Sequence, residues 1–69
     1  MSSNNIMGCM EHIVQCANNA LRMRKVVEDN SKPSSLRYQA VILEEAHLQL
    51  IQRYIEQIDK IKVHSIENT

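Results

Sequence analysis

The sequence contains no Phe and no Trp, and among its 69 residues there are only two Tyr, one Gly and one Pro. It therefore lacks the large aromatic side chains that usually fill a compact core, and its length allows at most one small domain. Below about 70 to 80 residues, a single core rarely supplies more than a few kcal/mol unless disulfides, a metal or association add to it. We expect this chain to need help of that kind.

An excess of charge of one sign is also missing, because eight Lys and Arg balance eight Asp and Glu. The basic residues are dispersed, apart from Arg22, Arg24 and Lys25. Nucleic-acid-binding proteins usually carry a basic stripe and a net positive charge, so the composition disfavours that class. No apolar run approaches the ~20 residues that span a bilayer, and the first residues lack the pattern of a signal peptide. We expect a cytoplasmic protein that neither binds nucleic acid nor inserts into a membrane.

What the chain does have is apolar residues at helical spacing in two segments. They predict helices at about residues 5–29 and 35–64. The turn between them, at residues 30–34, falls in "EDNSKPSS", which is rich in turn-forming residues and contains the only proline. No segment alternates as a strand would. The pattern predicts an all-α fold, with residues 1–69 forming a single antiparallel helical hairpin.

The first helix has more apolar surface than one neighbouring helix covers. Its expected core face consists of Ile6, Met10, Ile13, Val14, Ala17, Ala20 and Leu21. Four more residues flank this face, namely Cys9, Cys16, Met23 and Val27. Together they widen the apolar arc to about half of the circumference or more.

The second helix repeats this excess after an expected N-cap at Ser34 or Ser35, whose hydroxyl would accept an unpaired backbone N–H. Steps of three and four, typical of a coiled-coil seam, connect Leu36, Ala40, Leu43, His47, Leu50, Tyr54 and Ile61. A second row, Val41, Leu48 and Ile55, lies beside this seam, with Ile51 and Ile58 between the two rows.

A hairpin buries one row on each helix, so the second rows predict a binding surface for another protein. Burial of a Leu, Ile or Val side chain stabilises by ~1.5 to 3 kcal/mol, and an exposed row forgoes that contribution. The expected partner-binding residues are Val41, Leu48, Ile51, Ile55, Cys16, Met23 and Val27. In the alternative arrangement, the second helix is rotated so that both of its rows are half buried inside the hairpin.

The segment "GCMEHIVQC" contains Cys9, His12 and Cys16, which fall within an arc of ~60° on a helix and have the ligand chemistry of zinc. Structural zinc requires four ligands, and the two cysteines are separated by ~10.5 Å along a helix. That separation excludes an intrachain disulfide and makes a shared ion unfavourable. We expect neither a metal nor a cofactor, and small apolar cysteines of this kind are usually inert.

No catalytic constellation is present in the sequence. His47 lies in the middle of the second seam, where a packed imidazole is a more common finding than a pH-sensitive group. Glu44 and Glu45 are adjacent, so their side chains point ~100° apart on a helix and cannot act as a carboxylate pair. We therefore expect no enzymatic activity.

The segment "LRYQAVILEEAHLQLIQRYIEQIDKI" resembles the second helix of the small helical-hairpin co-chaperones of bacterial type III secretion. The likeness consists of a Tyr-Gln after a polar turn, then "VILEEA" and an Ile-rich amphipathic end, in a chain of similar length. It implies binding to a second chaperone built of helix-turn-helix repeats, with the pair keeping the needle-forming subunit unpolymerised in the cytoplasm. Some relatives turn through a glycine-rich loop, where this chain has "NSKPSS".

Two other classes of interaction protein also fit the spare apolar rows. In a homodimeric four-helix bundle acting as a regulator, two hairpins would bury each other's spare rows by symmetry. That assembly would present Arg22, Arg24 and Lys25 twice. An antitoxin-like inhibitor would bury the same rows against its target, and the sequence does not distinguish it from a co-chaperone. A weak homodimer is compatible with binding to another protein, whereas the regulator requires a dimer that does not dissociate on dilution.

Overall fold

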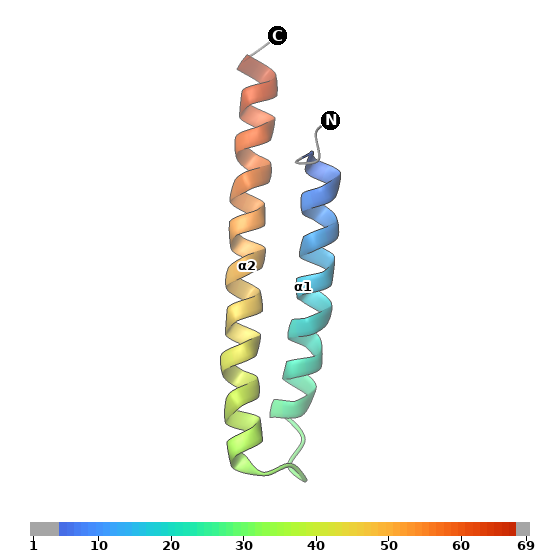
Figure 1. Ribbon diagram of the computed structural model, residues 1–69, viewed down its shortest axis with the longest axis vertical. Helices are drawn as coiled ribbons and strands as arrows, with labels where there is room; N and C mark the ends of the chain where they lie inside the picture. Colours follow the sequence, from blue (N-terminus) through green and yellow to red (C-terminus); the bar gives the residue numbers. More distant parts are fainter. Residues whose placement is uncertain (1–4, 68–69) are drawn as a thin grey trace.

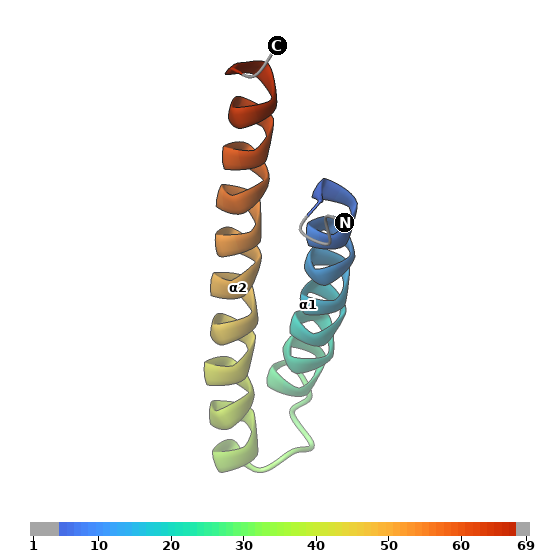
Figure 2. The same ribbon diagram turned by 45° about the horizontal axis from the view of Figure 1, so that its top comes forward.

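The computed structural model describes residues 5–67, with side chains up to His64, and folds them into two antiparallel helices. Helix α1 spans Ile6–Val27 and helix α2 spans Ser34–Glu67. The two helices lie side by side in both ribbon views, and α2 extends beyond the start of α1 (Figures 1 and 2). The molecule measures 56 × 15 × 14 Å, so it is a rod one helix pair thick. The expected all-α helical hairpin is confirmed.

Local signals in the sequence fix both ends of α1. Asn5 is the N-cap, and its side-chain oxygen accepts a hydrogen bond of 2.7 Å from the backbone N–H of Gly8. Arg24 and Lys25 lie in the last turn, where positive charge interacts favourably with the helix dipole. The helix is therefore slightly shorter than the expected 5–29.

The connection between the helices is held by side chains rather than by a glycine. The Asp29 carboxylate accepts hydrogen bonds from the backbone N–H of Ser31 at 3.0 Å and from its hydroxyl at 2.6 Å. These bonds favour the ionised carboxylate and lower the pKa of Asp29. Arg37, on α2, donates from Nε to the Val27 carbonyl and from Nη2 to the Asn30 side chain. One arginine thus ties α2 to the end of α1.

The start of α2 corrects the expected N-cap. Ser34 and Ser35 are both already helical, so the cap position falls on Pro33. The Pro33 carbonyl accepts the first helical bond, from the N–H of Arg37 at 3.1 Å. The turn accordingly occupies residues 28–33 rather than 30–34, and α2 continues to Glu67, three residues past its expected end.

The seam between the helices follows strict alternating steps of three and four. On α1 the seam residues are Ile6, Cys9, Ile13, Cys16, Ala20, Met23 and Val27. On α2 they are Arg37, Ala40, Glu44, His47, Ile51, Tyr54, Ile58 and Ile61, and these are the only positions of α2 with described side chains that are not exposed. This is the spacing of an antiparallel coiled coil.

The seam corrects the core that hydrophobicity alone predicts. On α1, the expected core residues Met10, Val14, Ala17 and Leu21 are exposed, while Cys9 and Cys16, expected only at its margin, are buried. On α2, three leucines of the expected seam are exposed, namely Leu36, Leu43 and Leu50, and Ile51 and Ile58 replace them. Small side chains occupy the most buried positions of the seam, where they let the two helices approach closely, and larger ones such as Ile13, Ile51 and Tyr54 are half-buried there.

Candidate protein-interaction surface

The most buried positions of the hairpin carry small side chains, and many large apolar side chains are exposed. Among the described residues, the buried side chains are Cys9, Cys16, Ala20 and Ala40, each no more than 9% exposed, and no large side chain is fully buried. Many large apolar side chains lie outside, with Met7 70% and Ile42 63% exposed. Exposed apolar side chains mark an interaction site where they form a contiguous patch.

The exposed apolar residues divide into two faces, one along each edge of the seam. In an antiparallel pair of right-handed helices, positions one residue after the seam lie along the same edge on both helices. Positions one residue before the seam share the opposite edge. Each edge therefore combines side chains from α1 and α2.

The apolar residues that lie one position after a seam residue form the first of these faces, which is here named the methionine face. It consists of Met7, Met10, Val14 and Leu21 from α1 with Val41, Leu48 and Ile55 from α2, and all seven are at least 40% exposed. Side-chain contacts agree with this assignment, since Arg24 of the same α1 row bonds to Glu44 across the seam. A shallow hollow lined by Val27, Arg37, Tyr38 and Val41 lies at the loop end of this edge.

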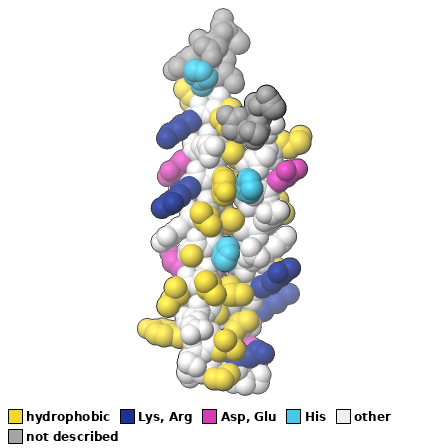
Figure 3. All heavy atoms as spheres, viewed as in Figure 1, with side chains coloured by type: hydrophobic (Ala, Val, Ile, Leu, Met, Phe, Trp, Pro, Cys, Tyr) yellow, Lys and Arg dark blue, Asp and Glu magenta, His cyan; other side chains and the backbone are white. Residues whose placement is uncertain are grey.

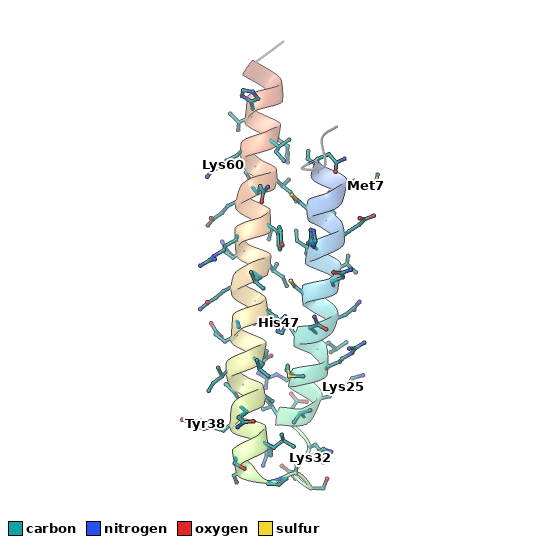
Figure 4. The ribbon with its side chains drawn as sticks, in the orientation of Figure 1. Met7, Lys25, Lys32, Tyr38, His47 and Lys60 are labelled. Atoms are coloured by element: carbon teal, nitrogen blue, oxygen red, sulfur yellow. The ribbon has the colours of Figure 1, made fainter. Side chains whose placement is uncertain are left out.

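The opposite edge is here named the leucine face, after Leu36, Leu43 and Leu50 on α2. Leu36 and Leu43 line a hollow together with Met23 and Val26 of α1. The viewed side of the molecule carries hydrophobic side chains over the boundary between the helices (Figure 3). His47 lies between the helices in the same view (Figure 4). Each leucine is separated from the next by seven residues, so the three follow one line along α2.

Arg24 and Glu44 form the strongest polar link between the helices. Arg24 donates from Nε at 2.9 Å and from Nη2 at 2.6 Å to the two carboxylate oxygens of Glu44. The hydrogen bonds to Glu44, and then its charge, raise the pKa of Arg24. Glu44 thus occupies a seam position with its charge paired, and the pair fixes the register of the two helices.

The group Cys9, His12 and Cys16 is divided by the fold. Both cysteines are free thiols buried in the seam. His12 lies at the leucine-face edge and stacks on Tyr54, with ring centroids 5.0 Å apart and planes 10° apart. Within residues 5–64, no three metal-ligating side chains come together. His47 also has a local partner, because its Nδ1 lies 2.7 Å from the Leu43 carbonyl, as expected for an N–H donor.

The seven expected partner-binding residues separate into two groups. Val41, Leu48 and Ile55 are exposed on the methionine face, where a partner can reach them. Cys16 is buried in the seam, which corrects its expected place on the outer surface, while Met23, Val27 and Ile51 are half-buried seam residues. Met7, Met10, Val14 and Leu21 were missed as surface residues, and their alternating three- and four-residue steps are the signal that could have found them.

No helix within the described part of the chain is long and apolar enough to cross a bilayer. No protein-family model, curated protein or solved structure matches the sequence.

Proposed function

We propose that this chain is a non-enzymatic co-chaperone that binds and stabilises a helical-repeat chaperone of a type III secretion needle subunit. The observation that carries the binding role is the methionine face, whose seven apolar side chains are all at least 40% exposed. The resemblance of α2 to the type III co-chaperones supplies the class of partner. The needle subunit would then be kept unpolymerised in the cytoplasm by the two proteins together.

The exposed area supports a partner of substantial size. The chain exposes 5464 Å². A compact monomer of 8.0 kDa exposes about 4,450 Å², so the excess is about 1,000 Å². One partner in a standard protein–protein interface buries about 800 Å². The surplus surface is therefore sufficient for one stable interface.

The shape of the methionine face favours helices as the binding partner. Val41, Leu48 and Ile55 recur every seven residues along α2, and the methionine-face row of α1 runs antiparallel to them. Two such rows accept a further helix by the same interdigitation of side chains that joins α1 to α2. A chaperone made of stacked helix pairs offers several helices of this kind.

Co-expression with the helical-repeat needle chaperone of the source organism tests the proposal. We expect Leu48→Glu or Ile55→Glu to abolish capture of that chaperone on an affinity resin, because each change buries a carboxylate in an apolar interface. Ile42→Glu is the matched control, since Ile42 is an exposed isoleucine of the same helix on the side away from α1. Full capture by Leu48→Glu and Ile55→Glu would refute this interface.

Light scattering over a hundredfold range of concentration separates the co-chaperone from the homodimeric regulator. The co-chaperone proposal predicts a monomer, or a dimer that dissociates on dilution, when the chain is alone. A dimer that persists at all concentrations, and that Leu48→Glu converts to monomer, would instead assign the methionine face to a second copy of the chain.

A further inference from the structure

The proposed co-chaperone interface leaves the leucine face unoccupied, although this face has the more concave apolar surface. Its hollow lies at the junction of the two helices, between Met23 and Val26 on one side and Leu36 and Leu43 on the other. Leu50 continues the line one heptad further and is 40% exposed. The three leucines cover about 21 Å along α2, equal to about four turns of a partner helix.

Charge is distributed unequally between the two edges of the seam. Along the edge of the leucine face, the row before the seam carries Arg22 on α1 with Arg53 and Lys60 on α2, all exposed, and no carboxylate within residues 5–64. Ion pairs in this part of the chain involve Arg24 alone, so these three cations are unpaired. In Figure 4, the Lys60 side chain on α2 and the Lys25 side chain on α1 project from opposite sides of the hairpin.

The edge of the methionine face carries charges of both signs. Its rows carry three carboxylates, Glu28, Glu45 and Asp59, and two cations, Arg24 and Lys62, with a slight acidic excess. Arg24 is already neutralised by Glu44 and by Glu28. The net charge of zero therefore conceals one basic edge and one slightly acidic edge of mixed charge, and the two faces suit partners of different charge.

We propose that the leucine face is a second docking site, which binds an amphipathic α-helix of another protein whose apolar stripe is flanked by Asp and Glu. The apolar stripe of that helix fills the hollow between Met23 and Leu43 and continues to Leu50. Its carboxylates lie against Arg22, Arg53 and Lys60. This site uses different residues from the proposed co-chaperone interface, so each can be tested separately.

Two features favour a helix over the other possible occupants. A lipid surface is contacted best by apolar side chains that protrude, whereas this apolar surface is hollowed at the helix junction, where a third helix inserts its side chains. A second copy packed leucine face to leucine face would bring Arg22, Arg53 and Lys60 of both copies together, and that repulsion disfavours a symmetric dimer.

The test uses two designed helical peptides of about seven turns, long enough to reach from Leu36 to Lys60, with identical leucine stripes but with Glu flanks in one and Lys flanks in the other. Fluorescence anisotropy with the full chain should give at least about tenfold tighter binding of the Glu-flanked peptide at low salt. Combining Arg53→Glu with Lys60→Glu should reverse this preference. That reversal is a readout that loss of structure would not produce.

A matched pair of substitutions then locates the site. Leu43→Ser should weaken binding of the Glu-flanked peptide by about tenfold or more, while Leu48→Ser, on the methionine face, should leave it unchanged. Both residues are exposed, and circular dichroism of each variant checks that the helices persist.

Three results would overturn the proposal. The first is an affinity that does not depend on the charge of the peptide flanks, or no binding of either peptide. The second is sedimentation of the chain with phosphatidylserine vesicles that Leu43→Ser removes, which would assign the face to a membrane surface. The third is self-association that Leu43→Ser removes, which would assign it to a second copy.

Discussion

The seam and the two outer faces of this hairpin are both apolar, but they differ in how deeply their side chains are buried. The most buried seam positions carry cysteines and alanines, larger side chains such as Ile13, Ile51 and Tyr54 are half-buried in the seam, and the named apolar residues of the two faces are exposed. Burial of small side chains contributes little to stability, because the contribution scales with the apolar area removed from water. The small seam residues therefore specify how closely the helices approach each other, while the exposed faces leave further apolar area that a partner can bury.

The largest expected effect comes from a charge placed in the seam rather than on a face. Ala20 is 6% exposed, and Ala17, one turn earlier on α1, is exposed on the methionine-face edge. Ala20→Glu should destabilise by about 3 kcal/mol or more and abolish cooperative unfolding, because the carboxylate would be buried without a partner. Ala17→Glu should remain within about 0.5 kcal/mol of the parent chain.

Thermal unfolding followed by circular dichroism measures both alanine variants. A melting curve for Ala20→Glu that matches the curve for Ala17→Glu would show that the seam does not separate buried from exposed positions as described.

A smaller effect distinguishes two adjacent glutamates. Glu44 lies in the seam and accepts both hydrogen bonds from Arg24, whereas Glu45 is exposed on the acidic edge. Glu44→Ala should lower the melting temperature, and the difference from the parent should shrink as salt screens the ion pair. Glu45→Ala should change little. Equal melting temperatures for the two variants would contradict a structural role for the Arg24–Glu44 link.

The smallest effect concerns the turn, where the seam ends. The pKa of Asp29 is lowered by its hydrogen bonds from Ser31. The ionised carboxylate therefore contributes stability above its ordinary pKa of about 4, and this contribution is lost as pH falls through the lowered value. Asp29→Asn should melt at a lower temperature than the parent at neutral pH.

This difference between Asp29→Asn and the parent should disappear in acid, where the parent aspartate is protonated. A difference that persists unchanged to low pH would show that Asp29 acts through its shape rather than through its charge.

The two helices and the position of the turn follow directly from apolar spacing and from the Asn, Ser and Pro residues between the segments. The seam was only partly predictable: Ala20, Ala40 and Tyr54 were assigned to it, but Leu43 and Leu50 were assigned to it wrongly. Hydropathy ranks Leu50 and Ile51 alike, and which of the two lies in the seam depends on the register of the alternating three- and four-residue steps. Glu44 was also unexpected in the seam, because its pairing with Arg24 depends on the register of the folded hairpin.

The division between seam and faces also separates the residues that fix the fold from those that choose a partner. A change at Leu43 or Ile55 alters what the hairpin recognises without disturbing Cys16, Ala20 or Ala40. A few substitutions on the faces could therefore give the same hairpin a new binding partner. A larger side chain at almost any of the buried seam positions would instead be eliminated by selection.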